Sequence, residues 1–216
     1  MSGDVQVRFC ERLGVKFPRA THLVVGFEHR EDAERFLGEL RERFARFGLT
    51  LHPDKTRLIE FGRQADRARR GRGDRKPETL NFLGFTHACS KTRKGRFTVL
   101  RQTMRQRWQA KLQAVSTALR QRLHEPIPDH GAYLRSVALG HARYYGVPRN
   151  GPRLSAFRFA LVRLWRAALM RRSQTARVSW ERMARLSTRW LPFPRICHPY
   201  PSQRLAFVTQ GKSRMR

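Results

Sequence analysis

Acidic residues are scarce in this 216-residue chain, which has 16 Asp and Glu against 46 Lys and Arg and a formal net charge of +30. The imbalance is steepest after residue 100, where 3 acidic residues face 24 basic ones, against 13 and 22 before it. Charge of this density repels itself and favours a polyanionic partner. Most of the basic residues are arginines, whose planar guanidinium pairs with phosphate and stacks on bases. Nucleic acid is therefore the first expectation, and an anionic membrane surface is the competing one.

Cysteine is also rare. Cys10, Cys89 and Cys197 are scattered, and no C-x-x-C pair occurs. This pattern indicates neither a disulfide framework nor a zinc site. The Cys197–His198 dipeptide has no second pair at ligand spacing, so a structural turn is favoured over a metal site. We expect no metal and no cofactor.

Long apolar runs and familiar catalytic signatures are missing as well. No run approaches the ~20 apolar residues that span a bilayer, and the segment "MSGDVQVRFC" contains no apolar signal core. We therefore expect a cytoplasmic protein with no membrane partner. The chain contains no Walker-type phosphate loop, no G-x-S-x-G and no H-E-x-x-H, which leaves little support for a catalytic function.

Apolar residues are nevertheless plentiful enough for packed cores, at 40% of the chain with 14 Phe and 4 Trp. The first 100 residues mix periodicities: a strand is predicted at 24–27, a helix at about 30–47 and a second strand at about 58–61. The basic stretch 63–77 has almost no apolar residue and is predicted to be a mobile loop. A β-hairpin with a basic tip is predicted around "KTRKG".

After residue 100 the periodicity is helical. An apolar stripe from Met104 to Leu123 predicts one helix, which Pro126 and Pro128 should end. A second helix is predicted at about 131–145 and a third from Pro152 to about 172, with one more short helix in "VSWERMARLSTRWL" and a Pro-rich tail beyond. The prediction is thus an α+β chain whose second half is a bundle of about three helices.

Basic side chains on these helices, with two tyrosines between them, are the candidate nucleic-acid ligands. Partly exposed tyrosines can stack on unpaired bases, although each tyrosine fits a core position equally well. His141 is predicted to be a packed or hydrogen-bonding residue rather than a base. The candidate set is Lys55, Arg101, Arg105, Arg107, Lys111, Arg135, Tyr144, Tyr145, Arg158, Arg163, Arg166, Arg171 and Arg172.

A series of segments then resembles a known family. "VVGFEHREDAERFLGELRERFARFGLTLHPDKTRLIEFGR", "LNFLGFTH", "TMRQRWQAKL", "LRSVALGHARYYGVP", "FRFALVRLWRAALMRRSQ", "WERM" and "RICHPYPSQR" are similar, in order, to the later half of bacterial group II intron reverse transcriptase/maturases. The resemblance runs from about Leu23 to Arg204. It implies that 23–100 is the C-terminal part of a polymerase palm of short antiparallel strands plus one helix. It further implies that 101–175 is the thumb, or maturase domain, which grips intron RNA, and that 176–216 is a short helix with a Pro-rich basic tail.

The sequence departs from that family where the chemistry belongs. Family members carry Tyr-Ala-Asp-Asp just before the "VVGF"-like strand, and here Thr21 and His22 stand in place of the two Asp. Two Mg²⁺ ions need anionic oxygen ligands, which a hydroxyl and an imidazole do not supply. No catalytic residue is therefore assigned, and Mg²⁺ is expected only if a missing N-terminal half complements the chain.

Three functions remain open at this point. The first is an RNA-binding maturase fragment that holds structured intron RNA, with DNA as a second polyanion, and does not polymerise alone. The alternatives are the C-terminal piece of an active split RNA-directed DNA polymerase and a non-functional decayed fragment. Residues 1–22 do not match the family, and a palm without its central strands would expose unpaired sheet edges.

Overall fold

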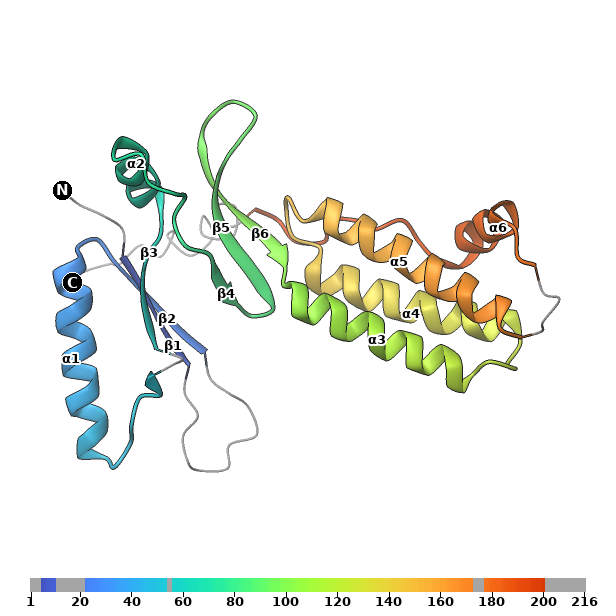
Figure 1. The fold of residues 1–216 in the computed structure, drawn as a ribbon, viewed down its shortest axis with the longest axis horizontal. Helices are drawn as coiled ribbons and strands as arrows, with labels where there is room; N and C mark the ends of the chain where they lie inside the picture. The colour runs from blue at the N-terminus through green and yellow to red at the C-terminus, as the bar shows by residue number, and fades with distance from the viewer. Residues whose placement is uncertain (1–4, 11–21, 54–55, 173–176, 201–216) are drawn as a thin grey trace, which may run out of the picture. The chain divides into compact units, whose positions relative to one another are not determined.

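The computed structural model describes residues 5–10, 22–53, 56–172 and 177–200, with the side chains of 5–10 and 22–23 excluded. The chain divides into two compact units, Met1–Leu100 and Arg101–Arg216, here called unit 1 and unit 2. Unit 1 combines strands and helices, and unit 2 is helical apart from the end of one strand (Figure 1). The predicted α+β class is confirmed.

The first sheet of unit 1 has the strand order β2-β1-β3. Strand β1 (Val5–Cys10) pairs antiparallel with β2 (His22–Phe27) and with β3 (Arg57–Glu60). Its register places Val7 opposite Val25 on one side and opposite Leu58 on the other. The segment that lies outside the family resemblance thus supplies the central strand of this sheet. The sheet therefore has a central strand, β1, paired on both sides.

Helix α1 (Arg30–Arg46) packs on this sheet through its apolar stripe. Ala33 is fully buried, and Phe36 lies 5.2 Å from Phe27 between ring centroids. The periodicity of three and four that predicted this helix places its apolar residues on one face. The predicted strand and helix of this region are both confirmed.

A second helix, α2 (Arg63–Gly71), occupies the stretch predicted to be a mobile loop, so that prediction and the count of one helix in this region are wrong. The helix buries only Ala65 and Asp66, because its sequence has no apolar stripe to bury. Polar contacts hold it instead. Arg69 pairs with Glu60 of β3 at 2.8 Å, and Arg70 with Asp66 at 2.9 Å.

The second sheet is β4 (Leu80–Phe82), β5 (Phe85–Lys91) and β6 (Phe97–Thr103), in that order. Strands β5 and β6 form the predicted hairpin. Its tip is closed by the Thr92 amide, which donates to the Arg96 carbonyl at 2.8 Å, and by Gly95, whose φ of 73° suits a residue without Cβ.

Unit 2 is built on α3 (Arg105–Gln121), α4 (Ile127–Tyr145), α5 (Gly151–Met170) and α6 (Trp180–Trp190). One apolar core joins all four helices. Trp165 of α5 and Met183 of α6 are both fully buried in it. The short helix predicted at the C-terminal side is thus part of the bundle, which has four helices rather than about three.

Helix α4 begins four residues earlier than predicted. Pro128 lies in its first turn, where a missing N–H costs no hydrogen bond, so this proline opens the helix instead of blocking it. The loop before α5 is fixed by the buried Asn150. Its side chain accepts from the Thr103 amide at 3.1 Å and donates to the Thr103 hydroxyl at 2.9 Å and to the Tyr145 carbonyl at 2.8 Å.

Residues Pro192–Tyr200, here called the strap, run back beside the bundle as extended chain (Figure 1). The Gly146 carbonyl accepts from the Cys197 amide at 2.7 Å and from the His198 amide at 3.0 Å, and a His198 ring nitrogen lies 2.6 Å from the Arg143 carbonyl. The Cys197–His198 dipeptide therefore attaches the strap to the end of α4, but the chain here is extended and does not form the predicted turn.

Candidate nucleic-acid interface

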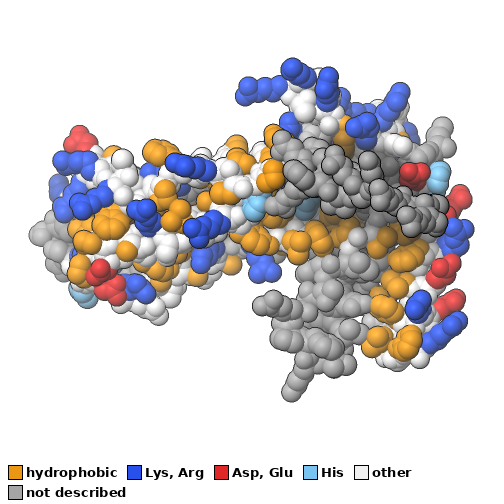
Figure 2. All heavy atoms as spheres, turned by 180° about the vertical axis from the view of Figure 1, so that it is seen from behind, with side chains coloured by type: hydrophobic (Ala, Val, Ile, Leu, Met, Phe, Trp, Pro, Cys, Tyr) orange, Lys and Arg blue, Asp and Glu red, His pale blue; other side chains and the backbone are white. Residues whose placement is uncertain are grey.

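The charge of unit 2 has almost no internal compensation. Among its described residues, Glu125 is the one carboxylate that forms an ion pair. It lies 3.7 Å from Arg122, and both side chains are exposed. Figure 2 shows Lys and Arg side chains spread over one face of this unit among hydrophobic side chains, with few acidic ones. A polyanion can therefore approach this surface without displacing internal partners.

The predicted nucleic-acid ligands differ in how exposed their side chains are. Lys55 and Thr21 lie outside the described residues, and His22 begins β2. Arg101, at the end of β6, and Tyr145 are half-buried. The exposed candidates are Arg105, Arg107, Lys111, Arg135, Tyr144, Arg163 and Arg171.

Three predicted ligands direct their guanidinium groups to backbone carbonyls of unit 2. Arg158 donates to the Leu191 carbonyl at 3.2 Å and to the Ser187 carbonyl at 3.3 Å. These bonds hold the C-terminal end of α6 on α5. We therefore assign this arginine a structural role and leave it out of the interface.

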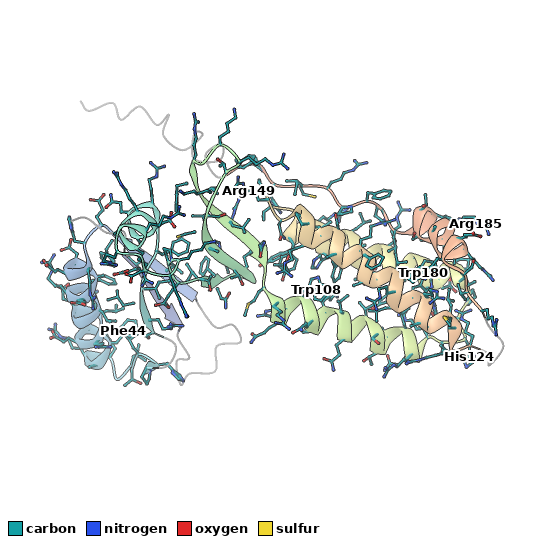
Figure 3. The ribbon with its side chains drawn as sticks, turned by 45° about the horizontal axis from the view of Figure 1, so that its top comes forward. Phe44, Trp108, His124, Arg149, Trp180 and Arg185 are labelled. Atoms are coloured by element: carbon teal, nitrogen blue, oxygen red, sulfur yellow. The ribbon has the colours of Figure 1, made fainter. Side chains whose placement is uncertain are left out.

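Arg166 and Arg172 are engaged in the same way. Arg166 donates to the Val178 carbonyl at 2.9 Å and lies over the ring of Trp180, which Figure 3 labels. Arg172 donates to the Glu125 carbonyl at 2.6 Å. Both arginines fasten neighbouring segments to the bundle and are also left out of the interface.

A hollow of about 400 Å³ between α3 and α4 brings several predicted ligands together. We call it the α3–α4 groove, and it is lined by Lys111, Ser136, Val137, Gly140, His141, Tyr144 and Tyr145. Arg107 and Lys111 are four residues apart on α3 and therefore lie on one face of that helix. Tyr144 is 53% exposed, and its ring meets that of Tyr145 edge-on at 4.8 Å. The groove thus combines the Lys111 cation with an exposed aromatic ring, and Arg107 lies one turn away on the same face of α3.

Burial determines the protonation states in the groove. Burial, with a smaller contribution from Lys111, lowers the pKa of His141 to about 4, so this ring is neutral at pH 7. It stacks on Phe157 at 3.7 Å between centroids, which confirms the prediction that His141 is a packed residue. Burial also raises the pKa of Tyr145, and Tyr144 adds to that rise while the nearby Arg107 opposes it. Tyr145 therefore keeps its hydroxyl proton.

Sequence reasoning missed the small residues that open the groove. Ser136 and Gly140 precede Tyr144 at intervals of four on α4, so the three residues share a face. A Cβ at Gly140 would meet no atom within 4 Å. The available signal was this four-residue spacing of small residues before an aromatic one.

In the described ranges, no group of three or more His, Cys, Asp or Glu side chains is placed to hold a metal ion. No helix in the same ranges has both the length and the apolar character needed to cross a bilayer.

Comparison with family models, with curated proteins and with solved structures finds no match for this chain.

Proposed function

We propose that this protein binds RNA through unit 2 and is a relative of the group II intron maturases. The observation that carries the proposal is the α3–α4 groove, where Lys111 and an exposed Tyr144 share one hollow. Cationic grooves with exposed aromatic rings suit RNA because the cations contact phosphates while bases stack on the rings. Arg107, beside Tyr145, extends the cationic edge along α3.

The charge balance supports the same proposal. Affinity for nucleic acid comes largely from phosphate contacts that release counterions. Unit 2 has 24 basic and 3 acidic residues, and a carbonyl-bound arginine such as Arg166 keeps its charge while losing its freedom to reach outward. The exposed basic residues can contact phosphates directly. The arginines that donate to carbonyls contribute only to the positive potential of the surface.

The ordered run of family-like segments favours structured intron RNA as the substrate, with DNA as a weaker polyanionic ligand. We propose further that the chain does not polymerise DNA by itself. Thr21 and His22 occupy the place of the family's Asp pair, and neither residue type provides the anionic oxygens that two Mg²⁺ ions require.

A filter-binding titration of the full chain tests RNA binding. We expect an affinity that falls steeply between 50 and 200 mM salt, roughly in proportion to the number of phosphates contacted. Structured intron RNA should compete better than a random duplex of equal length. An affinity independent of salt would contradict the proposal, and equal competition by the two RNAs would remove its intron-specific part. Primer extension with Mg²⁺ tests the second part, which template-dependent incorporation would overturn.

A further inference from the structure

A second hollow, of about 480 Å³, lies between α4, α5 and the strap and is here called the strap cavity. Its inner wall includes Phe157, which is buried, and His141, which stacks on it within 14° of parallel. Its outer wall includes Phe193 of the strap, which is 72% exposed. The volume falls in the range of about 300–1,000 Å³ that is typical of small-molecule sites.

Two contacts hold the strap and its Phe193 ring in place beside this cavity. The strap is attached to α4 through the Gly146 carbonyl, and a Cβ at position 146 would press on the Arg195 carbonyl and the Cys197 amide. The Arg158 guanidinium lies 4.3 Å from the centroid of the Phe193 ring and holds it from the α5 side. The aromatic walls are therefore positioned before any ligand enters.

The charges around the cavity are of one sign. Its lining includes Arg143, Arg158 and Arg195 and no acidic residue. Arg143 and Arg195 are exposed, whereas Arg158 is committed to backbone carbonyls. His141 adds a buried ring that contacts Phe157 and Tyr145. The complementary ligand therefore has a flat, largely apolar ring and an anionic group beside it.

We propose that the strap cavity receives the base of one unpaired nucleotide of bound RNA, while Arg143 and Arg195 hold the adjoining phosphate. This inference rests on the proposed function. Unpaired bases can be splayed out and stacked on aromatic side chains, and the cavity offers the exposed ring of Phe193 with cations beside it. His141 is buried between the strap cavity and the α3–α4 groove and lines both.

Two RNA duplexes of the same sequence test the proposal with the full chain. One carries a single bulged 2-aminopurine, and the other carries an abasic linker at the bulge. We expect the bulged base to bind at least about fivefold more tightly, the lower end for one stacked base. The 2-aminopurine fluorescence should also be quenched on binding.

Variants of residues that line the strap cavity test whether the bulged base binds there. Ala142→Phe fills the cavity, and Phe193→Ala removes its exposed aromatic wall. Both should abolish the preference for the bulged base and leave affinity for the perfect duplex unchanged. Arg195→Gln should weaken binding of the bulged RNA more than Arg185→Gln, an exposed arginine on α6 that Figure 3 labels and that does not line the cavity.

The outcomes separate this inference from the proposed function. Equal affinity for the bulged and abasic duplexes would overturn the base-binding inference and leave RNA binding standing. A preference that survives both cavity variants would also overturn it. Competition by adenosine monophosphate at micromolar concentration would show a site for free nucleotides and would contradict an RNA-borne base. Failure to bind any RNA would refute the proposed function itself.

Discussion

Gly131 on α4 approaches the ring of Trp190 on α6 so closely that a side chain at position 131 has no room. A Cβ built at Gly131 lies within 3.0 Å of three atoms of that ring. Trp190 is half-buried against the core of unit 2, so its ring cannot move aside freely. We therefore predict that Gly131→Ala destabilises unit 2 by forcing α6 away from α4.

The magnitude follows from comparison with Gly140 on the same helix, where a Cβ meets nothing within 4 Å. Alanine stabilises a helix interior by about 1 kcal/mol relative to glycine, and this gain cancels between the two variants. Overpacking costs about 1–3 kcal/mol. Gly131→Ala should thus be less stable than Gly140→Ala by about 1–3 kcal/mol, and Gly140→Ala should exceed the wild type by up to about 1 kcal/mol.

Urea unfolding followed by tryptophan fluorescence measures this difference. All four tryptophans, Trp108, Trp165, Trp180 and Trp190, belong to unit 2, so the signal reports that unit and not unit 1. If Gly131→Ala proves as stable as Gly140→Ala, the described packing of α6 on α4 is wrong.

Three further predictions use the same unfolding assay. Asn150→Ala leaves the buried amide of Thr103 without its acceptor. The free energy of unfolding should fall by about 2–4 kcal/mol, because more than one buried polar group loses its partner. A fall below about 0.5 kcal/mol would contradict a buried network. Because burial lowers the pKa of His141 from 6.5 to about 4, the unfolded chain binds the proton first, so stability should fall as pH drops through that window. His141→Phe should flatten this fall, and an unchanged pH profile would count against the buried ring. Arg166→Gln should cost about 1–3 kcal/mol of stability, because it removes a charged hydrogen bond, while reducing RNA affinity no more than Arg185→Gln does; a markedly larger loss of affinity would restore Arg166 to the interface.

Apolar periodicity was sufficient to predict the elements that bury a continuous stripe. Helices α1, α3 and α5 and the β5–β6 hairpin were predicted from their sequences because their apolar residues recur at helical or alternating intervals. Helix α2 could not be found in this way, since it buries only Ala65 and Asp66 and is held by ion pairs such as Arg69–Glu60. Pro128 misled for another reason, because a proline blocks a helix interior but suits a first turn.

The candidate site was predicted residue by residue but not as an arrangement. The spacing of Arg107 and Lys111 places both on one face of α3, whereas the approach of Lys111 to Tyr144 depends on how α3 and α4 are placed in the bundle. Nor does a sequence show which guanidinium reaches a carbonyl 12 residues away, as Arg166 does, or 47 residues away, as Arg172 does. Tertiary packing alone separates these structural arginines from the exposed ones.

The central claim is that RNA binds at the α3–α4 groove. Its most direct test is the salt dependence of RNA affinity for Arg107→Gln/Lys111→Gln against Arg182→Gln/Arg185→Gln, a pair of exposed arginines on α6 with the same loss of charge. The groove variant should bind at least about tenfold more weakly at a fixed salt concentration, and its slope of log affinity against log salt should be smaller by about 1–2. The α6 variant should differ little from the wild type in both quantities. Equal losses for the two variants would contradict the account, because they would mean that RNA responds to total charge and not to the groove.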